Sequence, residues 1–130
     1  MTDFSDALRI ASSGMNAQAS RMRYVSENMA NSDTPGYRRK MVEFEREFAP
    51  GAGAGGVELG PVRLDRSELS LVHDPSHILA DETGHYEGSN VDLLVEIADA
   101  REASRSYEAN LKVFDQVRQM STSLMELLRR

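Results

Sequence analysis

Three histidines and several carboxylates fall close together in the stretch HDPSHILADETGH, and side chains of these types could bind a metal ion. A zinc site, however, needs three or four ligands held in a fixed geometry. This stretch has instead the residue order of turns, with Asp74 before Pro75 and Asp81 three positions before Gly84. We therefore interpret it as turns and predict no metal and no cofactor. The candidate residues of this middle-region motif are Asp74, Pro75, His77, Asp81 and Gly84.

Two further chemistries can be weighed in the same part of the chain. Serine, histidine and aspartate occur together, but the GxSxG nucleophile elbow of a hydrolase is missing from the sequence. The run GAGAGG at residues 51–56 invites comparison with phosphate loops, which need a Gly-Lys-Ser or Gly-Lys-Thr sequence opening a helix, whereas VELGP follows here. We predict a flexible Gly-rich linker at 51–56, no enzyme activity and no small-molecule substrate.

Two long segments with heptad spacing flank this middle part. Their apolar residues follow steps of four and three, which place one narrow stripe along a helix. In the second segment the spacing slips by one position after Phe114, and neither Gly nor Pro interrupts residues 91–130. Gly14 lies inside the first segment, where its cost to a helix suggests the close approach of another backbone or a bend, the alternative being a tolerated weak position. The candidate seam residues are Leu8, Ala11, Met15, Met22, Val25 and Met29 in the first segment and Ile97, Tyr107, Leu111, Phe114 and Leu124 in the second.

Neither helix can bury a narrow stripe alone, so we expect the two to pack against each other. The predicted fold is mainly α, with long N- and C-terminal helices forming an antiparallel coiled-coil hairpin and a small β-containing middle region. The expected boundaries are 1–32 for the first helix, 33–88 for the turn and the short-stranded middle, and 89–130 for the second helix. Apolar residues also lie outside the stripes, Ile10 and Val95 among them. The pattern leaves open whether the helices form a core alone or a core and an assembly surface.

The middle region changes to a period of two. In MVEFEREF the residues Val42, Phe44 and Phe48 alternate with glutamates, which predicts one strand with an apolar face and an acidic face. VELGPVRL predicts a second extended run, broken at Gly60 and Pro61, and ELSLVHD predicts a third. This region is too small to be stable by itself. It is therefore expected to pack on the helix pair or on a neighbouring molecule.

The stretch ANSDTPGYRR joins the first helix to the first strand. Asn31 is a candidate for a left-handed helix cap, and Pro35-Gly36 fits the centre of a type II turn from Thr34 to Tyr37. We expect the basic residues that follow, at positions 38–40, to meet acids. These are either the glutamates of the first strand in a neighbouring molecule or Asp92 and Glu96 of the second helix.

Composition excludes several classes of partner. The chain of 130 residues has a formal net charge of -6, which disfavours binding to nucleic acid because phosphate contacts depend on Lys and Arg. There is no cysteine, so disulfides and thiolate metal sites are excluded. No apolar run reaches the length that spans a bilayer, so no direct membrane insertion is expected.

Several motifs resemble those of one bacterial family. ALRIASSGMNAQASRM followed by NMANSDTPGY is similar to the N-terminal signature of flagellar rod and hook proteins, whose hallmark resembles ANxxTPGY. The fixed places of this hallmark are filled by Ala30, Asn31, Thr34, Pro35, Gly36 and Tyr37. DPSHILADETGH and ASRSYEANLKVF resemble the middle and C-terminal elements of a proximal rod protein of the family, with Ile78 standing where proline is usual.

The resemblance implies a structural function. Proteins of this family are exported through the flagellar type III apparatus without a cleaved signal peptide, and they polymerise into the rod of the basal body. The expected partners are therefore other rod proteins, further copies of the same chain and the export apparatus, and the expected location is the periplasm-spanning rod. The alternative is a generic helical-hairpin interaction module, either an adaptor or another axial protein of the same family.

Overall fold

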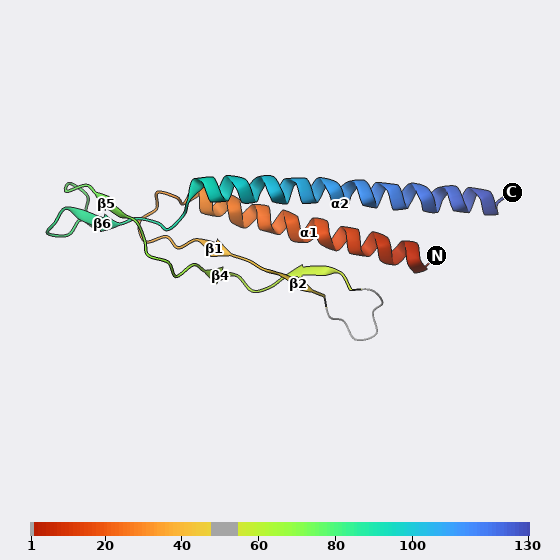
Figure 1. Ribbon diagram of the computed structural model, residues 1–130, viewed down its shortest axis with the longest axis horizontal. Helices are drawn as coiled ribbons and strands as arrows, with labels where there is room; N and C mark the ends of the chain where they lie inside the picture. The colour runs from red at the N-terminus through yellow and green to blue at the C-terminus, as the bar shows by residue number, and fades with distance from the viewer. Residues whose placement is uncertain (1, 48–54) are drawn as a thin grey trace.

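The computed structural model describes residues 2–47 and 55–130, and these form two long helices and six short strands (Figure 1). Helix α1 spans Thr2–Ala30 and helix α2 spans Leu93–Leu128. The strands between them are β1 (Lys40–Met41), β2 (Phe44–Arg46), β3 (Val57–Leu59), β4 (Arg63–Leu64), β5 (Leu71–His73) and β6 (His85–Glu87). The prediction of a mainly helical chain with a small strand-containing middle is confirmed. The Gly-rich linker lies mostly outside the described residues, as does Phe48.

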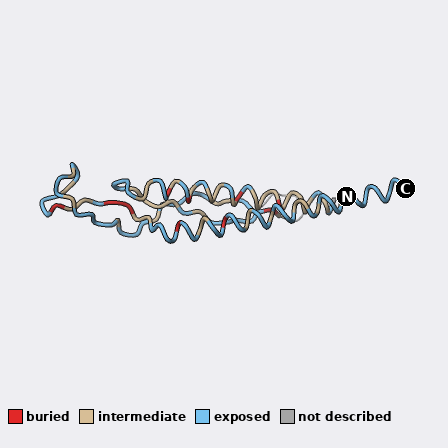
Figure 2. The backbone as a smooth tube through the Cα atoms, turned by 90° about the horizontal axis from the view of Figure 1, so that it is seen from above, coloured by how far each residue is buried: buried red, intermediate tan, exposed pale blue. Residues whose placement is uncertain are grey.

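The two helices lie side by side and run in opposite directions, with both chain ends at the same end of the molecule (Figures 1 and 2). Small residues line their contact, since Ala11 of α1 and Ala103 of α2 are buried. A Cβ atom on Gly14 would lie 2.8 Å from Nδ2 of Asn110 on α2. The predicted close approach at Gly14 is therefore confirmed, and the neighbour is a side chain of the other helix.

The buried face of α2 is displaced by one position from the predicted stripe. Glu96 and Ala103 are fully buried, and Asn110, seven residues further, meets Gly14. Ile97 and Leu111, which were expected in the seam, are 38% and 41% exposed. A buried carboxylate requires polar partners, and those of Glu96 are Asn28 on α1 and Arg39 directly before β1, so this residue turns toward them. The predicted apolar stripe consequently runs along the edge of the helix contact.

The strands form three separate antiparallel pairs, β1 with β4, β2 with β3, and β5 with β6. The strand predicted in MVEFEREF is confirmed in part, because β2 covers Phe44–Arg46 whereas Val42 and Glu43 lie between β1 and β2. The extended run VELGPVRL is interrupted at Gly60 and Pro61, as predicted. Its two halves, β3 and β4, therefore pair with different strands. Strand β6 was not predicted, since three residues carry too little alternation to be recognised.

The β2–β3 pair packs on the N-terminal half of α1. The Val57 amide donates to Oγ of Ser13 over 3.0 Å, and Arg9 forms an ion pair with Glu47 at 3.1 Å. Gly56 is buried there, and a Cβ atom on it would lie 2.6 Å from the Ser13 hydroxyl. Among the described residues, neither helix is long and apolar enough to cross a membrane.

Candidate functional site

The turn between α1 and β1 has the predicted type II geometry. The Tyr37 amide donates to the Thr34 carbonyl over 3.1 Å, and Gly36 has a φ of 74°, which type II turns require at their third residue. The left-handed cap predicted at Asn31 is wrong, since no described residue other than glycine has a positive φ. Asn31 instead donates from its side-chain Nδ2 to the Glu27 carbonyl over 2.8 Å. It thus satisfies the helix end without the left-handed conformation, which is costly for a residue with a Cβ.

This turn is tied to the segment that follows β6. The Gly36 amide donates to the carbonyls of Glu87 (3.3 Å) and Gly88 (3.0 Å). The Ser89 hydroxyl donates to the Ser32 carbonyl, and the Arg39 amide donates to Oδ1 of Asn90 over 2.6 Å. The entry to the middle region and its exit are therefore held together at one point.

Asn28, near the end of α1, uses its whole hydrogen-bonding capacity at this point. Its Nδ2 donates to the Lys40 carbonyl (2.9 Å) and to Oε2 of Glu96 (3.3 Å). Its Oδ1 accepts from the Tyr37 hydroxyl and from the Lys40 amide, each over 2.9 Å. An amide side chain has two donor hydrogens and two acceptor sites, and all four are occupied. Because Asn28 is 1% exposed, these bonds form away from water and connect α1, the turn, β1 and α2.

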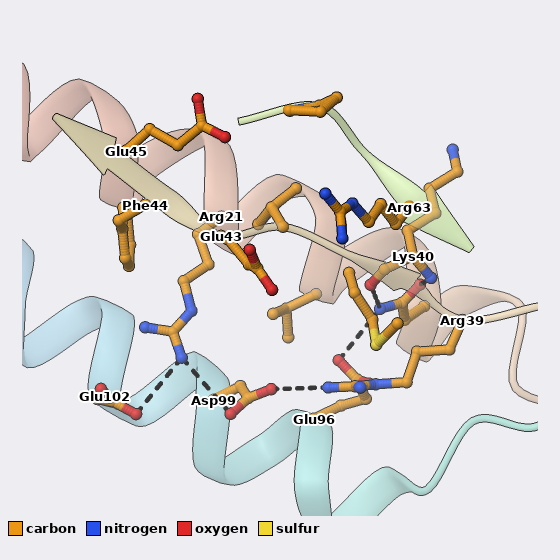
Figure 3. A pocket seen from close by; sticks show the side chains of 15 residues that line it. Arg21, Arg39, Lys40, Glu43, Phe44, Glu45, Arg63, Glu96, Asp99 and Glu102 are labelled. Carbon is orange, nitrogen blue, oxygen red and sulfur yellow. Dashed lines mark hydrogen bonds and ion pairs between the residues drawn. The ribbon is translucent and has the colours of Figure 1, made fainter. Parts of the chain in front are cut away.

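Charged groups continue this network (Figure 3). Arg39 donates from Nε to Oε1 of Glu96, which is 0% exposed, and from Nη2 to Oδ2 of Asp99 over 3.0 Å. Partial burial acts to lower the pKa of Arg39, but the hydrogen bond and charge of Glu96 outweigh it, and the pKa lies above its ordinary value. Arg21 reaches the same Asp99 at 3.5 Å from α1. The pairing of the basic segment with Glu96 is thus confirmed, within a single molecule.

The other basic residues after the turn find different partners. Lys40 forms an ion pair with Glu27 of α1 at 2.7 Å. Arg38 donates to the carbonyl oxygens of Asp65 and Ser67 at 3.2 and 3.1 Å. Asp92, which was expected to meet a basic residue, accepts a hydrogen bond from the Leu94 amide over 3.0 Å and caps α2. A carboxylate is favourable in that place because it satisfies an amide that the helix leaves unpaired.

A cleft of 680 Å³ lies between the helix pair and the strands β1 and β2 (Figure 3). Its floor carries the ion pairs around Glu96 and Asp99, and its walls include Val25 and Phe44. The guanidinium of Arg21 lies over the ring of Phe44, 5.7 Å from its centre. The charges of Arg39, Glu96 and Asp99 are paired with one another, and the network joins the helix pair to the strands. We call the network of Asn28, Tyr37, Arg39, Glu96 and Asp99 the junction.

The histidine-rich stretch forms a loop between β5 and β6. The rings of His73 and His85 lie 4.7 Å apart, whereas His77 stacks on Tyr86 with ring centres 3.9 Å apart. The three histidines are thus divided between two contacts. In the part of the chain that is described, no group of three or more His, Cys, Asp or Glu could hold a metal ion.

The carboxylates of this loop accept hydrogen bonds from it. Oδ1 of Asp81 accepts from the Thr83 hydroxyl over 2.6 Å and from the His85 amide over 3.1 Å. Oδ1 of Asp74 accepts from the Ser76 hydroxyl over 2.7 Å. The hydroxyl bonds are the main reason that the pKa of each aspartate lies below its ordinary range. Gly84 has a φ of 79°, which suits glycine at a turn.

Several residues in or next to the junction were not predicted from the sequence. Asn28 lies three positions after Val25, so helix geometry places it on the seam face, but a polar residue does not extend an apolar stripe. Ser89 and Asn90 act through contacts with segments more than 50 positions away, which no local pattern reveals. The available signal for the junction in the sequence was Asn28, a polar residue on the seam face of the first helix.

Comparison with known proteins covers both sides of the junction. The family model described as "Flagella basal body rod protein" matches residues 8–38, and that described as "Flagellar basal body rod FlgEFG protein C-terminal" matches residues 82–127. The flagellar basal-body rod protein FlgC of Agrobacterium fabrum is 42% identical over 136 aligned positions, which cover 99% of this chain and 98% of that protein. FlgC of Escherichia coli O6:H1 is 36% identical, over 91% of this chain and 92% of that protein. FlgC of Bacillus subtilis is 32% identical, over 98% and 99%. The chain therefore belongs to the family of the flagellar basal-body rod protein FlgC.

Proposed function

We infer that this chain is a structural subunit of the rod of the bacterial flagellar basal body, and that it polymerises into the proximal part of the hollow shaft that transmits torque. Its relatives at 42%, 36% and 32% identity are rod proteins, and the match covers nearly their whole length. The junction supports this role, because it sets a fixed angle between a long helix pair and a strand-containing arm.

The observation that carries the proposal is the apolar surface that α2 leaves uncovered. Leu94 is 78% exposed and Leu127 is 65% exposed, and Val113, Met120 and Met125 are also exposed. Each square ångström of apolar surface removed from water is worth about 25 cal/mol, so neighbouring subunits would gain stability by covering these side chains. Contacts between unlike surfaces that repeat without closing produce a filament.

We propose that the candidate seam residues divide between two tasks. Ala11 and Val25, which are buried, hold α1 against α2. Ile97, Leu111 and Leu124, which are exposed, contact neighbouring subunits in an inner layer of coiled-coil helices. Of the remaining seam candidates, Met29 is exposed, and the half-buried ones are Leu8, Met15, Met22, Tyr107 and Phe114.

The family hallmark has a defined task in this proposal. The turn formed by Thr34, Pro35, Gly36 and Tyr37, with Ala30 and Asn31 at the helix end, fixes the direction in which the strands leave the inner layer. In this proposal the strand-containing middle region forms an outer layer around the helices. The loop that belongs to this layer contains Asp74, Pro75, His77, Asp81 and Gly84. We propose export by the flagellar type III apparatus without a cleaved signal peptide, other rod proteins as partners, and no nucleic acid, membrane insertion, metal or catalytic substrate.

The second candidate is a generic helical-hairpin interaction module, which would also leave an apolar helix face exposed. Complementation separates the two proposals. A strain made non-motile by deletion of its own copy of this protein should regain motility, and contain the chain in its isolated rod fraction, when the gene is returned. A chain that binds soluble partners, restores no motility and is missing from the rod fraction would favour the interaction module.

A further inference from the structure

A depression on the β1–β4 ribbon combines positive charge with apolar surface. Arg38, Met41, Arg63, Leu64 and Arg66 line it, and its volume is 850 Å³. The lining contains three arginines and no acid, although the chain as a whole has a net charge of -6. Leu64 is 53% exposed. We call this surface the ribbon patch.

Among the described residues, the arginines of the ribbon patch form no ion pair with a carboxylate, although Arg38 lies near enough to Asp65 for their charges to interact. Arg38 donates only to main-chain carbonyls, those of Asp65 and Ser67. Over the described ranges 2–47 and 55–130, neither Arg63 nor Arg66 forms an ion pair or a side-chain hydrogen bond. A guanidinium group matches a carboxylate with two parallel hydrogen bonds. The patch is therefore suited to a partner that offers acids next to apolar side chains.

The loop at residues 74–84, which we call the tip loop, has this opposite character. Ile78 is 96% exposed and Leu79 is exposed beside it. From residue 67 to residue 92 the sequence has six acids and no lysine or arginine. Glu82 is exposed on the loop, next to Asp81. Acidic and apolar groups are thus presented together at the end of the β5–β6 hairpin.

The tip loop does not meet the ribbon patch of its own molecule. The β5–β6 hairpin lies at one end of the elongated molecule, whereas β4 lies beside the helix pair (Figure 1). Within the described residues, no hydrogen bond or ion pair joins residues 74–84 to β1 or β4. A contact between the two surfaces therefore requires two molecules.

We propose that the ribbon patch of one copy binds the tip loop of a second copy. Ile78 of one copy packs on Leu64 and Met41 of the other, and Glu82 pairs with Arg63 or Arg66. The two surfaces differ, so the contact is heterologous and repeats without closing by two-fold symmetry. The inference rests on the proposed role as a rod subunit and names one of the surfaces through which copies meet.

Disulfide trapping tests this contact cleanly because the chain has no cysteine. Protein with Ile78→Cys is mixed with protein with Leu64→Cys, and the mixture is oxidised. The matched control replaces the second partner by Ala19→Cys, at an exposed position of α1. We expect the heterodimer of the test pair to form about tenfold faster than that of the control pair, since a binding contact raises the effective concentration of the two thiols.

Charge reversal sharpens the test. Introducing Glu82→Arg on the tip loop, or Arg66→Glu on the patch, should each slow trapping about two- to fivefold, the range expected for an exposed ion pair. Combining the Glu82→Arg tip with the Arg66→Glu patch should restore the rate. Equal rates for test and control pairs, or trapping that requires a different rod protein, would overturn the proposal.

The same cysteine variants, kept reduced in a complementation assay, separate this inference from the proposed function. Normal motility together with no trapping contradicts the contact and leaves the rod role intact. Failure of the unaltered chain to restore rods overturns the rod role itself, whatever the trapping result.

Discussion

The junction and the free end of the helix pair are built in opposite ways. At the junction, Asn28 and Glu96 are buried and their polar atoms are bonded. At the free end, Leu127 and Leu128 project from the last turns of α2 with most of their surface exposed. The molecule thus joins its parts through a few long-range polar contacts and leaves much of its apolar surface exposed.

This difference follows from what each type of contact can do. A buried ion pair adds little net stability compared with apolar packing, because both charges lose their water, but it accepts few alternative geometries. Exposed apolar side chains set no geometry in the monomer, and covering them stabilises the assembled state by mass action. A rod subunit needs a defined angle between its helix pair and its strands, and elsewhere it needs apolar surface that neighbouring subunits can cover.

The largest effect on monomer stability is expected from Glu96→Ala. The substitution leaves Arg39 without its buried partner and one Nδ2 hydrogen of Asn28 unbonded. We expect the free energy of unfolding to fall by about 3 kcal/mol, the lower end of the range for breaking a buried pair. Urea denaturation followed by circular dichroism measures this.

The matched control is Glu102→Ala on the same helix, whose carboxylate is 68% exposed and pairs with Arg21 at 3.4 Å. It should cost less than about 1 kcal/mol. Equal losses for the two variants would remove the distinction between the junction and the surface.

The next largest effect is expected from Gly36→Ala. Nothing lies within 4 Å of the added Cβ, so the cost comes only from holding alanine at a φ of 74°. It should amount to about 1–2 kcal/mol. Gly14→Ala is the control, because its φ is not positive and Asn110, a flexible side chain, is the group that must move. A greater loss at Gly14 than at Gly36 would mean that helix packing is more sensitive than the turn.

Tyr37→Phe should cost about 1 kcal/mol, because it removes one hydrogen bond to the buried Oδ1 of Asn28. Tyr24→Phe is the matched control, since its hydroxyl accepts only an exposed contact from Arg23 at 3.3 Å. Thermal unfolding of both variants compares them directly. Equal melting temperatures for the two would show that the junction hydroxyl contributes nothing.

The ion pair of Lys40 and Glu27 should give a smaller effect that depends on pH. Their hydrogen bond lowers the pKa of Glu27 from 4.5 and raises that of Lys40 from 10.5. A lowered carboxylate pKa stabilises the fold above 4.5 and a raised amine pKa stabilises it below 10.5, so the contribution is complete between these values. The difference in unfolding free energy between the unaltered chain and Lys40→Gln should be constant from pH 6 to 9 and shrink below pH 4. A difference that grows on acidification would contradict this assignment.

The smallest effect on the monomer is expected from Leu127→Ser combined with Leu128→Ser. Both side chains are exposed, so the free energy of unfolding should change by less than about 0.5 kcal/mol. Chemical denaturation checks this. A loss above about 1 kcal/mol would mean that this end of α2 is packed in the free subunit.

The sequence predicted the parts of this structure that depend on local chemistry. Pro35 and Gly36 favour a type II turn through their own backbone preferences. The spacing of apolar residues predicts two long helices. The register of α2 could not be predicted, because the apolar stripe through Ile97 and Leu111 competes with a face centred on Glu96. Only the positions of Arg39 and Asn28 in space decide between them. The contact of the basic segment with Glu96 was predicted, whereas the central place of Asn28 was not, since its partners come from distant parts of the chain.

The most direct test of the central claim is the incorporation of subunits altered on the exposed face of α2 into rods. A variant with Leu94→Ser, Leu127→Ser and Leu128→Ser would be expressed in a bacterium that lacks its own copy, and its amount in the isolated rod fraction would be compared with that of the unaltered chain. We expect the triple variant to fold normally, with an unchanged free energy of unfolding, and to be absent from the rods. Incorporation at the level of the unaltered chain would contradict the claim that this face is reserved for assembly.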